Sequence, residues 1–146
     1  MKQYLNLLGK KSKKAFLNKV NTRTKNKVLN NFASLINKKR KLIILQNEKD
    51  IKNATKKKLK ENLISRLMLD SKKIDQMIIS IKTILKFKDP TNISLSKWMR
   101  PNGLKIEKVT IPIGIIGVIY ESRPNVTSDV SSLCFKSGNC VILRGG

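Results

Sequence analysis

The stretch "IPIGIIGVIYESRPNVTSDVSSLCFKSGNCVILRGG", residues 111–146, decides the fold class of this chain. The run "IIGVIYE" is apolar and β-branched, which is typical of a strand buried on both faces of a parallel sheet. The segment "VTSDVSSLCFKSG" is long enough for a crossover helix that closes at Gly138. The run "CVILR" is a second buried strand, so we expect two parallel strands joined by one helix.

The ends of these two strands carry the polar residues of interest. The loop "SRPN" lies at the carboxyl end of the first strand, where open parallel sheets bind their ligands. The second strand leads directly into Arg144, Gly145 and Gly146. A buried parallel pair needs cover on both faces and further neighbouring strands. We therefore expect the chain to be the front part of a longer protein or a truncated remnant of one.

Residues before this unit follow a helical period. Leu5, Leu8, Ala15 and Phe16 predict a helix over residues 1–20. A second helix is expected over residues 24–46, capped by Thr22 or Thr24, from a stripe of apolar side chains: Val28, Phe32, Leu35, Ile36 and Ile43. The segment "QNEKDIKNA", residues 46–54, offers turn residues. Leucines within residues 59–67 predict a short helix.

The clearest helix begins at Ser71 and ends before Asp89-Pro90. Its apolar positions fit one helical face: Ile74, Met77, Ile78, Ile81, Ile84 and Leu85. The period then changes to two around the turn signal Pro101-Asn102-Gly103, which predicts a hairpin. The sequence thus indicates an α/β chain with a helical part at 1–90, a hairpin at 91–112 and the start of a parallel sheet at 113–146.

The net charge of +23 raises the alternative of a basic, helical nucleic-acid-binding protein. The lysines are spread over nearly every polar helix face, and together with abundant Asn and Ile they indicate a compositional bias. We therefore expect no specific nucleic acid as partner. If a polyanion binds, it binds the N-terminal third, because the first acidic residue is Glu48.

Other classes of protein fit the sequence poorly. No apolar stretch reaches membrane-spanning length, and nothing resembles a signal peptide. The chain has no His, and Cys134 and Cys140 lack metal-ligand spacing, so we expect no metal. Both cysteines are expected to be small buried side chains in a reducing compartment, the cytoplasm.

The last quarter of the chain resembles the gamma-glutamyl phosphate reductases, members of the aldehyde dehydrogenase superfamily. The matching strings are "GIIGVIYE" at 114–121, "RPNVT" at 123–127 and "SLC", "K", "GN" and "VILRGG" from 132 to 146. Weaker likeness extends back through "TKNKVL" at 24–29 and "RLMLDSKKI" at 66–74. The resemblance implies an incomplete aldehyde dehydrogenase fold, in which residues 1–146 are the N-terminal part of a Rossmann-like cofactor-binding domain.

The resemblance also implies an activity and a cofactor. This family reduces L-glutamyl 5-phosphate with NADPH to L-glutamate 5-semialdehyde in L-proline biosynthesis. Its nucleophilic cysteine lies beyond residue 146, so Cys134 is not that residue and the catalytic domain is absent. We expect the 146-residue chain alone to be inactive and at best marginally stable. The hairpin would help to build a homo-oligomer. The alternative is that Trp98 and the hairpin belong to the ordinary core of the protein.

By resemblance, Asn125 would stabilise the oxyanion of the reaction through its side-chain amide. The alternative from the sequence is an N-cap of the helix that starts near Val126. Arg123 lies next to this position and is the candidate for binding the acyl phosphate of the substrate. Its charge could instead form a structural ion pair with Glu121 or Asp129, which is the interpretation that the residues alone favour.

Arg144 would bind the 2′-phosphate of NADP(H), because a guanidinium is a charged fork suited to phosphate. Its alternative is a pair with a surface carboxylate. Gly145 and Gly146 would let the backbone approach the cofactor closely, and Pro124 is assigned to the cofactor contact as well. An ordinary turn at the two glycines stays open.

Overall fold

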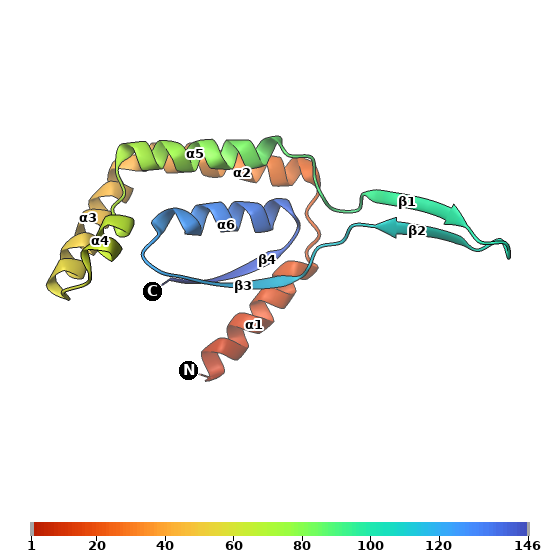
Figure 1. Ribbon diagram of the computed structural model, residues 1–146, viewed down its shortest axis with the longest axis horizontal. Helices are drawn as coiled ribbons and strands as arrows, with labels where there is room; N and C mark the ends of the chain where they lie inside the picture. Colours follow the sequence, from red (N-terminus) through yellow and green to blue (C-terminus); the bar gives the residue numbers. More distant parts are fainter. Residues whose placement is uncertain (1, 146) are drawn as a thin grey trace.

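The computed structural model describes residues 2–145 (Figure 1). Five helices come first, then a hairpin, then a strand–helix–strand unit, which confirms the predicted α/β class and order of elements. The elements are α1 (Lys2–Leu17), α2 (Thr22–Lys38), α3 (Arg40–Lys56), α4 (Glu61–Leu67), α5 (Ser71–Lys86), β1 (Ser94–Met99), β2 (Lys105–Val109), β3 (Ile115–Tyr120), α6 (Pro124–Lys136) and β4 (Cys140–Gly145).

The predicted parallel pairing is confirmed. Strand β3 pairs with β4 in parallel, from Ile115 opposite Cys140 to Tyr120 opposite Gly145. Helix α6 connects the two strands and closes at Ser137, and Gly138 follows with φ 73. A positive φ is easy for glycine and strained for other residues, so Gly138 ends the crossover helix as the sequence predicted.

The prediction that both strands are buried on both faces is wrong for the described residues. Alternate side chains of β3 are exposed, with Ile115 at 41% and Ile119 at 86%. Tyr120 belongs to the opposite face, where its hydroxyl meets Thr127 of α6. Helix α6 covers that face, whereas α1 reaches the other face at one end (Figure 1). An apolar run is typical of a strand covered on both faces, and residues 2–145 cover the second face only at the end that α1 reaches.

The core lies between α2 and α5, which pack side by side, with α6 against α5 (Figure 1). Eight apolar side chains form its buried centre: Leu29, Ala33, Ile36, Leu69, Ile74, Met77, Ile81 and Ile84. The face predicted for α5 is confirmed. The apolar stripe predicted for α2 is confirmed in part, since Ile36 is buried and Phe32 packs against the core. The prediction is wrong for Val28 and Leu35, which are exposed at 44% and 53%.

Two predicted boundaries in the helical part are also wrong. The predicted 24–46 helix breaks at Lys39, and α3 continues through the predicted turn at 46–54. Within α3, Asn47 is buried and its side chain bonds the linker, donating to the Leu67 carbonyl and accepting from the Leu69 amide. Asparagine favours turns, but here its buried side chain connects α3 to residues 67–69. The local sequence pattern does not indicate this long-range contact. The cap of α2 is Asn21, not Thr22 or Thr24.

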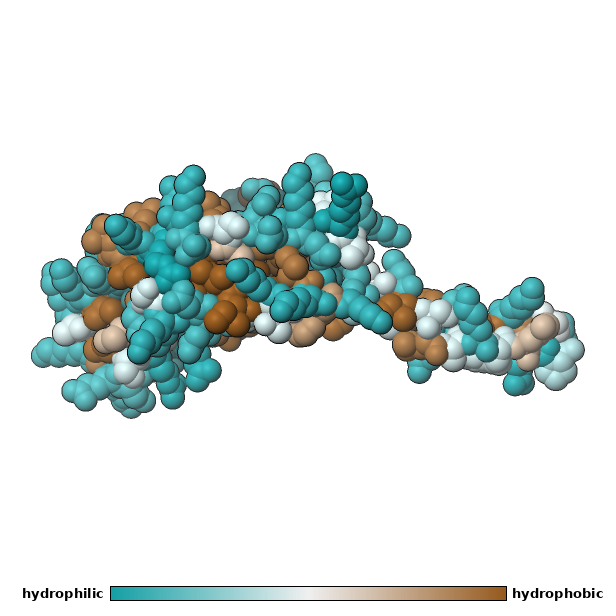
Figure 2. Space-filling view, turned by 90° about the horizontal axis from the view of Figure 1, so that it is seen from above, coloured by the Kyte–Doolittle hydropathy of each residue, from teal (hydrophilic) through white to brown (hydrophobic). Residues whose placement is uncertain are grey.

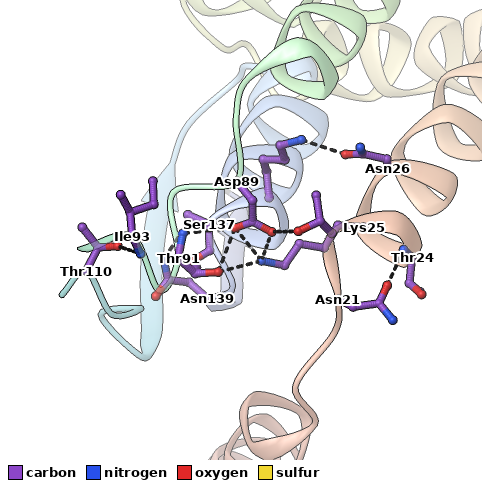
Figure 3. Close-up of polar contacts among 12 residues, drawn as sticks. Asn21, Thr24, Lys25, Asn26, Asp89, Thr91, Ile93, Thr110, Ser137 and Asn139 are labelled. Atoms are coloured by element: carbon purple, nitrogen blue, oxygen red, sulfur yellow. Dashed lines mark hydrogen bonds and ion pairs between the residues drawn. The ribbon is translucent and has the colours of Figure 1, made fainter. Parts of the chain in front are cut away.

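A buried ion pair joins the start of α2 to the segment after α5 (Figure 3). The Lys25 ammonium lies 2.9 Å from the Asp89 carboxylate, and their side chains are 4% and 13% exposed. Thr22 and Thr91 also donate to Asp89, so both of its carboxylate oxygens are bonded. Burial works to raise the pKa of Asp89, but hydrogen bonds from Lys25, Thr91 and Thr22 outweigh it and hold the pKa below its ordinary range.

A second buried lysine places α6 against the same helices. Lys136, at the end of α6, is 3% exposed. Its ammonium donates to the Asn26 side chain at 2.7 Å and to the Leu85 carbonyl at 3.0 Å. One side chain therefore ties α6 to α2 and to the last turn of α5, which fixes where α6 and its loop lie.

The β1–β2 hairpin projects away from the helical body as an arm (Figures 1 and 2). Its strands pair antiparallel around residues 100–104, as the Pro101-Asn102-Gly103 signal predicted. All six residues of β1 are exposed, and Trp98 is 46% exposed. The alternative that Trp98 and the hairpin are ordinary core is therefore wrong.

Replacing Asp89 by Asn should lower the free energy of unfolding by about 3–5 kcal/mol, because the Lys25 ammonium would stay buried without a counter-charge. Chemical denaturation followed by circular dichroism measures this loss. The pKa of Asp89 is lower in the folded chain, so its stabilising contribution is present above the unfolded pKa of about 3.9. That contribution is lost as the pH falls from there toward the folded pKa, and the Asn variant should lack this acid dependence.

Asp75→Asn is the matched control, since Asp75 pairs with Arg40 at the surface with a 56% exposed side chain. Solvent screens such a pair, so the control should change stability little. Equal stability of the Asp89 and Asp75 variants would show that the buried pair does not hold the helices together.

Candidate functional site

The candidate site lies at the carboxyl edge of the β3–β4 pair. Because the strands are parallel, their last residues meet: Ile119 lies opposite Arg144, and Tyr120 lies opposite Gly145. The loop after β3 leads into α6 at this edge. The structure therefore brings together the predicted residues Arg123, Pro124 and Asn125 with Arg144 and Gly145. Gly146, also predicted here, lies outside the described residues.

A sharp turn carries the chain from β3 into α6. Ser122 has φ 48, an uncommon conformation for a residue other than glycine. Helix α6 then begins at Pro124, whose fixed φ and missing N–H suit the first helical position. Arg123 is the cap residue and makes no side-chain capping bond. Asn125 is thus the second residue of the helix, and the alternative that it serves as the N-cap is wrong.

The Asn125 side chain is exposed at the start of α6 and points along the helix. Its Nδ2 donates to Asp129 Oδ2 at 3.1 Å. The second oxygen of Asp129 is buried and has no hydrogen-bond partner among residues 2–145. From the sequence, Asp129 is named only as a partner for Arg123. Its spacing of four residues from Asn125, which puts both side chains on one helix face, is the signal that indicates the Asn125–Asp129 contact.

Two guanidinium groups at this edge, those of Arg123 and Arg144, are exposed and form no ion pair within the described part of the chain. The ion pairs of residues 2–145 are Lys25–Asp89, Arg40–Asp75 and Lys97–Glu107. The ion pairs considered for Arg123 with Glu121 or Asp129, and for Arg144 with a surface carboxylate, are thus not formed among residues 2–145. Unpaired guanidinium groups make the edge suitable for an anionic ligand.

Tyr120 links the two parts of the edge, a role that the sequence did not predict. Its hydroxyl shares a hydrogen bond with Thr127 of α6. A Cβ placed on Gly145 would lie 3.7 Å from the Tyr120 ring and hydroxyl, which is ordinary contact distance. The described residues therefore leave room for a Cβ at position 145.

The surroundings of Cys134 and Cys140 do not favour a role as nucleophile. Cys134 is buried within α6, and burial raises the pKa of its thiol, with a smaller effect from nearby Cys140. A thiolate is the reactive form, so this environment disfavours reaction. Cys140 is half-buried at the start of β4, so its predicted full burial is wrong.

A groove of about 640 Å³ lies at the opposite, amino end of the strands. Apolar side chains of α1, α2 and α6 form much of its wall, including Phe16, Phe32 and Phe135. None of the residues predicted for the site lines this groove. Its volume alone therefore does not make it the place of the chemistry.

Within residues 2–145, no three His, Cys, Asp or Glu side chains gather as a metal site would need. In the same residues, no helix combines the length and the apolar character that a membrane crossing requires.

The fold and this edge define the class: an α/β protein whose parallel sheet carries an amide and two guanidinium groups at the carboxyl ends of its strands. No family model matches the chain. Comparison with known proteins nevertheless finds similar proteins, and the following five are named gamma-glutamyl phosphate reductases.

The chain is 48% identical to the gamma-glutamyl phosphate reductase of Caldanaerobacter subterraneus over 87% of its length, covering 31% of that protein. It is 50% identical to the one of Nautilia profundicola, with the same coverage. It is 42% identical to the gamma-glutamyl phosphate reductase of a Sulfurihydrogenibium strain, over 99% of the chain and 33% of the relative. The chain thus spans about a third of the length of these relatives.

Two solved structures share the fold. The gamma-glutamyl phosphate reductase of Thermotoga maritima superposes with a TM-score of 0.88 at 43% identity, over 94% of this chain and 34% of that one. The enzyme of Saccharomyces cerevisiae gives a TM-score of 0.88 at 30% identity, over 94% and 35%. The predicted resemblance to this family is therefore confirmed along almost the whole chain.

Proposed function

We propose that this chain is the N-terminal part of the cofactor-binding domain of a reductase that acts on L-glutamyl 5-phosphate. The product would be L-glutamate 5-semialdehyde, with release of phosphate, in L-proline biosynthesis. The observation that carries the proposal is the parallel register of β3 and β4, which sets Asn125 and Arg144 at one edge. The names of the relatives support the reaction class.

Asn125 would stabilise negative charge on the reacting carbonyl oxygen. Its amide stands at the first turn of α6, near the positive end of the helix dipole. An N–H held in place before the charge develops needs no reorganisation during the reaction. In a site shielded from water, one such donor lowers the barrier by about 2.7–4 kcal/mol.

Arg144 would bind the 2′-phosphate of NADP(H), and the residues present suit that group. The Arg144 side chain is exposed at the end of β4 and has no carboxylate neighbour within ion-pair distance among residues 2–145. Pro124, Gly145 and Gly146 would line the same cofactor contact. NADPH supplies the hydride for the reduction when it is bound.

Arg123 would hold the phosphate of the acyl phosphate substrate. It caps α6 without using its side chain for the cap, so the guanidinium can reach outward. A planar guanidinium donates two parallel hydrogen bonds to a phosphate, which orients the neighbouring carbonyl. With Arg123 on the substrate and Asn125 two residues later, one short segment would orient and stabilise the reacting group.

The β1–β2 arm would join copies of the protein into a homo-oligomer. A projecting two-stranded ribbon is marginally stable alone in water, and this one exposes apolar side chains such as Trp98 and Met99. The two free cysteines are consistent with action in the cytoplasm. A nucleic-acid-binding function is less favoured, because the relatives are named as reductases that act on a small molecule.

The 146-residue chain alone should show no NADPH-dependent reductase activity, because it lacks the nucleophilic cysteine that the reaction needs. Joining it to the rest of the Thermotoga maritima reductase should restore turnover, measured by NADPH absorbance with the acyl phosphate supplied. An inactive but folded joined enzyme would support a non-functional remnant. Turnover by the chain alone would show that the catalytic residues are misplaced.

In the joined enzyme, Asn125→Ala should lower kcat by about 10²–10³-fold, because one oxyanion donor is removed. Cofactor affinity should change little, since the amide does not contact the cofactor in this proposal. Asn62→Ala, an exposed asparagine of α4, is the matched control and should leave kcat unchanged. An unchanged kcat in the Asn125 variant would contradict the catalytic role.

Arg144→Ala should weaken binding of NADPH by roughly ten- to a hundred-fold and that of NADH much less. The loss of a charge-assisted bond to phosphate costs about 1.5–3 kcal/mol, and NADH has no 2′-phosphate. Fluorescence titration of both cofactors measures the difference, with Arg100→Ala in the hairpin turn as control. Equal weakening of both cofactors would instead place Arg144 on a group that the two share.

A further inference from the structure

We propose that Asp129 is a positioning residue that fixes the direction of the Asn125 amide. The proposal rests on the catalytic role of Asn125 given above. It extends that role to a residue one helical turn away, which touches neither substrate nor cofactor and acts through Asn125 alone.

The contact is local and directional. Asn125 and Asp129 are four residues apart on α6, and Nδ2 of the first donates to Oδ2 of the second at 3.1 Å. The amide nitrogen has two hydrogens. Because Asp129 takes one of them, the rotation of the amide is restricted and the second N–H points away from the helix, where a reacting oxygen could lie.

The chemistry of the partner decides which end of the amide is presented. The oxygen and nitrogen of an asparagine side chain have nearly the same shape, so the group can turn by half a rotation at little steric cost. An ionised carboxylate accepts hydrogen bonds and donates none. Asp129 therefore binds the NH₂ end and excludes the reversed arrangement, in which Asn125 would present an oxygen to a developing oxyanion.

Stability alone does not explain Asp129. Its Oδ1 is buried and lacks a hydrogen-bond partner among residues 2–145, which is costly for a carboxylate. Asp89 is a carboxylate with a structural role in the same chain, and both of its oxygens accept hydrogen bonds, from Lys25, Thr22 and Thr91. Asp129 has instead one bonded oxygen, and its bond goes to the proposed catalytic amide.

Two substitutions in the joined enzyme test this role. Asp129→Leu removes the acceptor and should lower kcat by about ten- to a hundred-fold with little change in KM, as expected when a catalytic group loses its orientation. Asp129→Asn retains an acceptor but adds a donor, so both orientations of Asn125 become populated. Its kcat should fall by about two- to fivefold. The melting temperatures of the two variants should not fall in the same order as their kcat values, because Asp129→Leu removes a carboxylate whose buried oxygen lacks a hydrogen-bond partner.

A double-mutant cycle separates positioning from a structural effect. In the Asn125→Ala background, Asp129→Leu should cause no further loss of kcat, because the group it positions is gone. If the double variant instead loses kcat by the product of the two single losses, Asp129 acts independently of Asn125 and the proposal is overturned. If Asn125→Ala itself leaves kcat intact, the proposed function of the site fails instead.

A measurement on the joined enzyme tests the contact without relying on its activity. The side-chain NH₂ signals of Asn125 in a ¹⁵N-correlated NMR spectrum should shift and exchange faster with water in Asp129→Asn. Ser131→Ala, two residues further along α6, is the control and should leave them unchanged. Signals of Asn125 that are the same in the wild type and the Asp129 variant would overturn the proposal even if the joined enzyme were inactive.

Discussion

The arrangement of this protein depends on two ammonium groups that are buried in its core. Lys25 bonds Asp89 and so ties the start of α2 to the segment that follows α5, from which the hairpin arm departs. Lys136 bonds Asn26 and the Leu85 carbonyl and so places α6 against both helices. A buried charge must keep its partners, because its solvation is lost. These bonds therefore restrict how α2, α5 and α6 can pack, more than non-directional apolar contacts could.

The position of α6 in turn decides what the carboxyl edge of the strands presents. Lys136 holds the last turn of α6, while the turn at Ser122 and the Tyr120–Thr127 contact hold its first turn against β3. The side chains of the first turn are thus supported from both ends of the helix. A site that bears a reacting group needs such support, because small displacements of a catalytic group are costly in rate.

The sequence predicted the β3–α6–β4 unit well, because the apolar runs and Gly138 are strong local signals. It predicted the buried face of α2 only in part, since Val28 and Leu29 are adjacent and both apolar, and only Leu29 is buried. Buried Lys25 and Lys136 could not be predicted, because lysines are ordinarily exposed and their partners lie far along the chain. The residues of the candidate site were predicted from the resemblance to a family. Their geometry, including the Asn125–Asp129 hydrogen bond, is visible only in the three-dimensional structure.

The bond between Lys136 and Asn26 joins residues 110 positions apart, and Lys25 and Asp89 are 64 apart. During synthesis the N-terminal end of a chain leaves the ribosome first, so α2 emerges long before the partners of its buried face exist. The apolar stripe of α2 must then stay in water, or with a chaperone, until α5 and later α6 have been made. Contacts between distant parts of a chain are slow to form. For this protein, the time between the synthesis of α2 and α6 is therefore the interval in which aggregation competes with folding.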